Sequence, residues 1–108
     1  MTRPEQLPEY LRVVVATFIQ READLPPGIL VTVTRVEVPG HRRNAAVWVS
    51  VLPEEQTDTV LKRLREILYD LQGEVNRKVT SLPVPRIHFR VDTGPARSAR
   101  IDELSQQL

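Results

Sequence analysis

The side chains with the clearest chemical potential are basic groups gathered late in the chain. Six of them lie between residues 77 and 100: Arg77, Lys78, Arg86, Arg90, Arg97 and Arg100. Asp92 is the only acid in that stretch, and a second basic cluster, His41-Arg42-Arg43, follows a Pro-Gly pair. Cations that accumulate with few acids can neutralise successive phosphates of a nucleic acid. Complementing a helix dipole would explain only the first two of the six, so a phosphate-binding surface and a plain polar surface both stay open.

Patterns typical of catalysis or metal binding are poorly represented. The chain has no cysteine, which excludes a thiolate nucleophile, a disulfide and a cysteine-ligated zinc. The two histidines are far apart, His41 in an expected turn and His88 in an expected strand. No nucleophile elbow, zinc-protease motif or phosphate-binding glycine loop occurs. We therefore expect a binding protein and not an enzyme, with no cofactor, no metal ion and no small-molecule substrate.

Length and composition predict a single domain of the α+β class over residues 1–108. The chain is 41% hydrophobic and 27% charged, which is a globular composition. Its net charge is only +1, so any affinity for a polyanion depends on how the basic groups are distributed. The first ten residues lack the apolar core of a signal peptide, and no stretch approaches the ~18 apolar residues of a membrane span. We expect a cytoplasmic protein with no membrane partner and, by default, a monomer.

The elements that position the basic groups can be predicted from periodicity. Helical spacing of apolar residues predicts one helix after Pro8 and a long one from about Glu54 to Val79. Residues 29–38 and 45–52 alternate as strands of a hairpin, with a change of phase that predicts a bulge near Thr34-Arg35. Residues 86–91 predict a third strand with a basic outer face, and the segment 94–108 predicts a turn and a short terminal helix. Trp48 is expected to pack beneath the first or last helix in preference to stacking on an RNA base.

Three segments carry a family pattern in order and spacing. They are FIQRE with the following Pro27-Gly28 and ILVTVTRVEV, then AAVWVSVL with Pro53-Glu54-Glu55, then PRIHFRVD with SARIDEL. Together they resemble the bacterial ribosome-binding factor A proteins. The resemblance implies a type II KH-like domain of helix-strand-strand-helix-helix-strand order with a short C-terminal helix. It also implies binding to the small (30S) ribosomal subunit and its 16S rRNA during late maturation and rRNA processing, notably in the cold, without enzymatic activity.

One region departs from the family pattern. The family has an alanine-x-glycine kink between its central helices, where this chain has Ile67-Leu68-Tyr69. The bend is therefore expected to be lost or moved to Gly73, since glycine is the weakest helix former after proline. The GxxG loop with which KH domains clamp RNA is also missing.

The expected RNA-binding residues are the basic groups of both clusters. They are Arg42, Arg43, Arg77, Lys78, Arg86, Arg90, Arg97 and Arg100. The alternative is a KH-like protein-protein adaptor that has lost RNA binding and presents a sheet edge or helix face to another protein. The salt dependence of binding separates the two, because phosphate contacts weaken steeply as salt rises.

Overall fold

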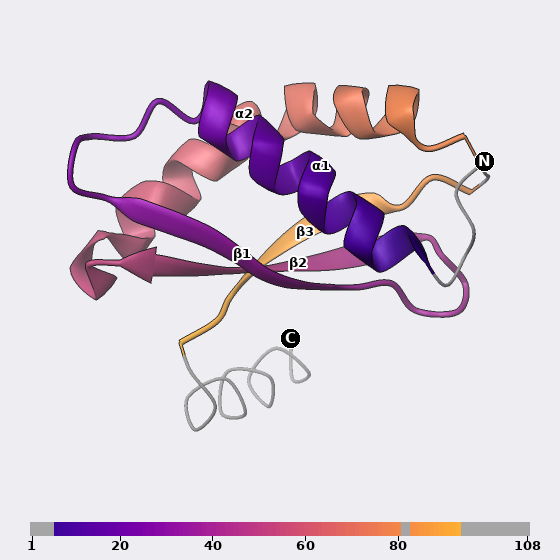
Figure 1. Cartoon of the computed structure of the whole chain (residues 1–108), viewed down its shortest axis with the longest axis horizontal. Coiled ribbons are helices and arrows are strands. Elements are labelled where there is room, and N and C mark those ends of the chain that lie inside the picture. Colours follow the sequence, from indigo (N-terminus) through magenta and orange to yellow (C-terminus); the bar gives the residue numbers. More distant parts are fainter. Residues whose placement is uncertain (1–5, 81–82, 94–108) are drawn as a thin grey trace.

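Two helices cover one face of a three-stranded sheet in the computed structural model of the chain (Figure 1). The structure describes residues 6–80 and 83–93. The elements follow in the order α1 (Leu7–Glu22), β1 (Leu30–Glu37), β2 (Asn44–Leu52), the 3-10 helix η2 (Glu54–Gln56), α2 (Thr57–Lys78) and β3 (Arg86–Val91). The predicted α+β fold is confirmed by this order. The predicted C-terminal helix lies outside the described residues.

The sheet has β2 as its central strand. β1 pairs with it antiparallel, and the register shifts between Val33 and Arg35, which confirms the predicted bulge. β3 pairs with β2 in parallel, beginning with Asn44 opposite Arg86. A parallel pair needs a long crossover, and α2 supplies it. As a result, the β1–β2 turn, the last turn of α2 and the start of β3 all lie at one end of the sheet, which Figure 1 shows on the right.

We call this end the hairpin end and define it by residues 38–43, 77–78 and 86. The opposite end contains the end of α1, the end of β2, η2 and the start of α2.

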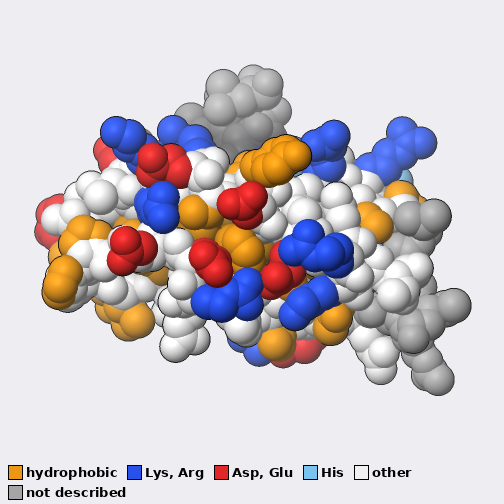
Figure 2. Space-filling model, turned by 90° about the horizontal axis from the view of Figure 1, so that it is seen from above, with side chains coloured by type: hydrophobic (Ala, Val, Ile, Leu, Met, Phe, Trp, Pro, Cys, Tyr) orange, Lys and Arg blue, Asp and Glu red, His pale blue; other side chains and the backbone are white. Residues whose placement is uncertain are grey.

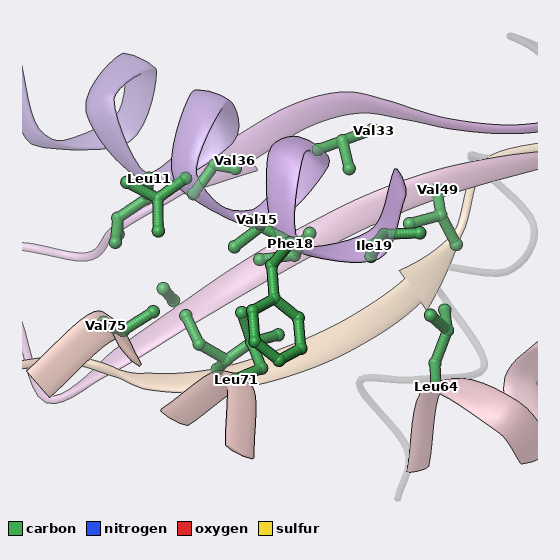
Figure 3. Packing of buried hydrophobic residues seen from close by; sticks show 14 of the residues in the cluster. Leu11, Val15, Phe18, Ile19, Val33, Val36, Val49, Leu64, Leu71 and Val75 are labelled. Carbon is green, nitrogen blue, oxygen red and sulfur yellow. The ribbon is translucent and has the colours of Figure 1, made fainter. Parts of the chain in front are cut away.

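The core forms where both helices turn their apolar stripes onto the inner face of the sheet (Figure 3). Alternation in β2 directs one set of its side chains into this core, and all four are buried: Ala45, Val47, Val49 and Val51. The stripe on α2 is also buried along its whole length: Val60, Leu64, Ile67, Leu71 and Val75. This packing fixes which sides of α2 remain exposed, and therefore which of its polar residues can contact a partner.

α2 passes through the position of the family's kink as an uninterrupted helix. In this stretch Ile67 is buried in the core, whereas Tyr69 is almost fully exposed. Gly73 continues the helix, and Figure 1 shows that α2 curves between its two halves without a break. The two central helices implied by the family resemblance are therefore one helix in this chain.

Candidate nucleic-acid interface

The hairpin end brings two basic residues from distant segments side by side. The backbone N–H of Arg86 donates a hydrogen bond to the carbonyl oxygen of Arg43 at 2.9 Å. This bond joins the residue before β2 to the first residue of β3. Both side chains are exposed, and neither has an ion-pair partner among the described residues. Parallel pairing thus converts two cations far apart in the sequence into neighbours, because paired strands lie about 4.8 Å apart.

The β1–β2 turn holds its basic residues in a closed local structure. The backbone N–H of Arg42 bonds to the carbonyl oxygen of Pro39 at 2.8 Å, and that of Arg43 bonds to Nδ1 of His41 at 3.0 Å. Arg42 adopts a left-handed backbone with φ of 57°. A side chain rarely occupies that region, because it brings the Cβ close to the following carbonyl oxygen. The turn therefore holds two adjacent cations in a fixed backbone geometry.

Gln72 connects α2 to the start of β3. Its Nε2 donates to the carbonyl oxygen of Pro85 at 3.0 Å, and its Oε1 accepts the backbone N–H of Ile87 at 2.9 Å. Arg86 lies between these two anchored residues. Its backbone position relative to α2 is therefore set by one amide side chain. Sequence reasoning missed this role, although a polar residue beside the buried stripe of an amphipathic helix was a signal that could have been followed.

The last turn of α2 contributes Arg77 and Lys78, both exposed. Arg77 lies 3.8 Å from Glu74, a long contact that compensates its charge only in part. The carbonyl oxygen of Lys78 accepts a hydrogen bond from the Tyr10 hydroxyl at 3.4 Å, which ties the end of α2 to α1. Arg77 and Arg86 line the same surface hollow, so these two predicted residues face a common space.

Arg90 lies apart from the hairpin end. Alternation along β3 places Arg86, His88 and Arg90 on the sheet face opposite the helices, which confirms the predicted basic outer face of this strand. Nε2 of His88 is 2.8 Å from the Asn44 side chain. Partial burial lowers the pKa of His88 below its usual value, and the charges of Arg90 and Arg86 lower it further. The exposed basic residues therefore form two groups, the hairpin end and a basic stripe along β3.

Trp48 lies on that same outer face, away from α1. Its indole N–H donates to Glu37 at 2.6 Å, and the Arg35 guanidinium lies 4.3 Å from the ring centroid. Of the two expected positions for Trp48, the one beneath the first helix is excluded, because Val47 and Val49 take the inward positions of β2. Packing beneath the last predicted helix concerns residues outside the described part. With 5% of its surface exposed, the ring offers no face to a base.

The helix-covered face has a different charge pattern. Figure 2 shows acidic and basic side chains interspersed on this face. Glu74 pairs with Arg21 at 3.1 Å, and Glu66 lies 3.8 Å from Arg63. These pairs compensate part of the charge on this face. Arg97 and Arg100 fall outside the described residues, so the structure places six of the eight predicted side chains.

Residues 6–80 and 83–93 lack two other features. This part of the chain contains no group of three or more His, Cys, Asp or Glu side chains that could hold a metal ion. No helix in it is long and apolar enough to span a membrane.

Comparison with known proteins identifies related chains. The family model described as ribosome-binding factor A matches residues 3–105. A ribosome-binding factor A of Gemmatimonas aurantiaca is 34% identical over 108 residues, covering 98% of this chain and 74% of the relative. That of Natranaerobius thermophilus is 33% identical over 107 residues, covering 98% of this chain and 82% of the relative.

Solved structures give the same result. The crystal structure of ribosome-binding factor A from Thermus thermophilus aligns with a TM-score of 0.69 at 25% identity, covering 82% of this chain and 96% of that one. A Thermotoga maritima protein solved by NMR aligns with a TM-score of 0.60 at 24% identity, covering 88% of this chain and 95% of that one. The second likeness shows the fold alone.

Proposed function

The chain belongs to the ribosome-binding factor A family, and from this membership we propose that it binds the small (30S) ribosomal subunit and its 16S rRNA during late maturation and rRNA processing. In this proposal residues 1–108 act as one domain, as a cytoplasmic monomer, with the largest effect in the cold. The protein acts by binding, without catalysis or a cofactor.

The convergence of basic residues at the hairpin end is the observation that supports the proposal most. Three segments, the β1–β2 turn, the end of α2 and the start of β3, each contribute cations there. Arg43, Lys78 and Arg86 have no ion-pair partner among the described residues, so their charges are available to phosphates. Contacts of this kind position a protein on folded RNA through its shape and backbone, not through its base sequence.

The proposed interface extends from the hairpin end along β3. It consists of Arg42, Arg43, Arg77, Lys78, Arg86 and Arg90, with Arg97 and Arg100 from the segment beyond the described residues. The basic stripe of β3 continues directly from Arg86, so a single RNA backbone could follow both parts.

The proposed mechanism is conformational. A protein that binds an immature rRNA conformation more tightly than the mature one raises the population of the immature conformation. The free-energy difference between the two conformations can shift by no more than the difference between their binding free energies. Release follows once maturation removes the preferred contacts. No bond is made or broken in this scheme.

Gradient co-sedimentation tests the proposal. Tagged protein is mixed with ribosomal particles at low and moderate salt, and free small subunits, large subunits and intact ribosomes are probed separately. We expect enrichment on free small subunits that is lost as salt rises. Recovery only at the top of the gradient at both salts would refute small-subunit binding. Binding that does not weaken as the salt concentration rises would instead indicate the adaptor function.

Charge reversal tests the assigned surface in the same assay. Arg86→Glu with Arg90→Glu should abolish most of the enrichment at low salt, where the unmodified protein is bound. Arg12→Glu with Lys62→Glu makes the same change in net charge outside the proposed interface and serves as the matched control. If both double variants sediment like the unmodified protein, the assignment of the surface is wrong.

A further inference from the structure

The exposed surface of α2 has two chemically different sides. Hydrogen bonds identify them: Glu74 accepts from Arg21 of α1, whereas Gln72 contacts Pro85 and Ile87 beside β3. The carboxylates of α2 that follow one another at i,i+4 spacing, Glu66, Asp70 and Glu74, lie toward α1.

The side of α2 toward β3 has no carboxylate in the middle of the helix. Helical spacing places Arg65 one turn before Tyr69 and Asn76 two turns after it, along the row that includes Gln72. All three of these side chains are exposed. The Tyr69 ring therefore lies in a row with Arg65 and Asn76, and Glu66, three residues before Tyr69, belongs to the neighbouring acidic row.

Tyr69 is the most exposed large hydrophobic residue of the described chain, with 87% of its surface accessible. No hydrogen bond or ring contact occupies it within the described structure. Figure 2 shows exposed hydrophobic side chains among basic and acidic groups on the helix face. Packing in the core does not account for a tyrosine at this position, since Ile67 fills the inward position of the same turn.

Gly73, one helical turn after Tyr69, adds no side chain to this surface of α2. A Cβ at Gly73 would meet a single side-chain atom, Nη1 of Arg77, at 3.5 Å. One row of the helix, with spacing i, i+4 and i+8, thus contains Tyr69, Gly73 and Arg77. The residue between the aromatic ring and the guanidinium is a glycine. The same hollow is lined by Tyr69, Asn76, Arg77 and Arg86, which joins it to the hairpin end.

We propose that Tyr69 is a stacking platform for one unpaired nucleobase of RNA, with Arg65 and Arg77 contacting the flanking phosphates. Bases splayed out of RNA loops stack on aromatic side chains, and such stacking tolerates any base because each has a π face. Guanidinium groups one turn before and two turns after the ring favour a polyanion over an apolar protein segment. This inference rests on the proposed RNA-binding function and adds a base contact to its phosphate contacts.

The test compares oligomers with and without bases. Fluorescence anisotropy measures binding of the full chain and of Tyr69→Ala to a ten-nucleotide oligoadenylate and to an abasic oligomer of equal length. We expect Tyr69→Ala to weaken oligoadenylate binding about tenfold, within the range known for one stacked base, and to leave abasic binding unchanged. Tyr69→Phe should bind as the unmodified protein does, because its ring still stacks. Val13→Ala, which trims another exposed apolar side chain, on α1, is the matched control.

Several outcomes would overturn the inference. They are equal binding by Tyr69→Ala and the unmodified chain, an equal loss on both oligomers, no preference of the unmodified chain for the oligomer with bases, and a loss in Tyr69→Phe as large as in Tyr69→Ala. An equal loss on both oligomers would indicate that the ring does not contact a base.

A parallel measurement on purified small subunits separates this inference from the proposed function. If the unmodified chain fails to bind subunits at low salt, the proposed function fails. If it binds and Tyr69→Ala binds equally well, only the stacking inference fails. Stacking releases no counterions, so the salt dependence of Tyr69→Ala should keep the slope of the unmodified protein.

Discussion

The two ends of the sheet differ in charge although the same strands run through both. The hairpin end presents exposed cations, among them Arg43, Lys78 and Arg86. The opposite end presents exposed carboxylates: Asp24, Glu54, Glu55 and Asp58. With a net charge of only +1, the chain as a whole attracts a polyanion weakly. The separation of charge between the two ends therefore decides how the chain would orient relative to the polyanion.

Topology is responsible for the basic end. The residue before β2 and the first residue of β3 are neighbours only because the two strands are parallel and share a hydrogen bond. A β3 that ran antiparallel would place Arg86 at the acidic end. The difference between the ends therefore depends on α2 as a crossover and on the contacts that fix where β3 begins.

The largest effect is expected when the hairpin end loses its charge. Arg43→Glu with Arg86→Glu should weaken small-subunit binding on the order of a hundredfold at low salt, because two attractive phosphate contacts become repulsive. Equilibrium binding to purified subunits measures this. Arg12→Glu with Lys62→Glu should change the affinity for the subunit little. Equal losses of affinity in the two double variants would contradict a special role of the hairpin end in binding.

The next effect concerns the connection between α2 and β3. Gln72→Leu removes both bonds that fix the start of β3 and leaves the Ile87 N–H and the Pro85 carbonyl without their partner. We expect the free energy of unfolding to fall by about 1–3 kcal/mol, as measured by urea denaturation. Gln20→Leu, on the exposed surface of α1, is the control. An unchanged midpoint for Gln72→Leu would show that these bonds do not hold the hairpin end together.

A smaller effect should separate the two parts of the interface. Arg86 belongs to the hairpin end, whereas Arg90 lies further along β3 and its Nη1 donates to the carbonyl oxygen of Phe89. Arg86→Gln should weaken subunit binding by roughly threefold to tenfold, because one phosphate contact is lost. Arg90→Gln should weaken subunit binding by less. The two single variants are compared in one titration at fixed salt. A larger loss for Arg90→Gln would move the centre of the interface onto the open sheet face.

The smallest effect is a pH dependence from His88. Because the pKa of His88 is lowered in the folded protein, the unfolded chain binds more protons between that pKa and about 6.5. Stability should therefore fall as pH decreases through this interval, and the loss is complete below the folded pKa. His88→Gln should flatten the unfolding free energy between pH 7 and pH 5 relative to the unmodified chain. Identical pH profiles would show that His88 does not contribute to this dependence.

Much of the fold was predictable because periodicity and turn residues agree. The bounds of β3 follow from alternation after Pro85, and the bulge near Arg35 follows from a change of phase in β1. The stripe on α2 predicted a long helix, and the helix is continuous through Tyr69.

The candidate site was less predictable, since it depends on contacts between distant segments. Sequence alone grouped Arg90 with Arg86, but could not show that Arg43 would become the nearer neighbour through strand pairing. The role of Gln72 requires knowing where β3 begins in space. Sequence alone could not choose between the first and the last helix as the cover of Trp48, whereas the structure excludes the first, because Trp48 lies on the outer face of the sheet.

The most direct test of the central claim is the slope of the logarithm of the dissociation constant against the logarithm of salt concentration for small-subunit binding. Phosphate contacts from the hairpin end predict a steep slope for the unmodified chain, and a slope shallower by about one to two for Arg43→Glu with Arg86→Glu. Arg12→Glu with Lys62→Glu should keep the steep slope. Parallel lines for all three proteins would contradict the claim that the hairpin end binds ribosomal RNA through its phosphates.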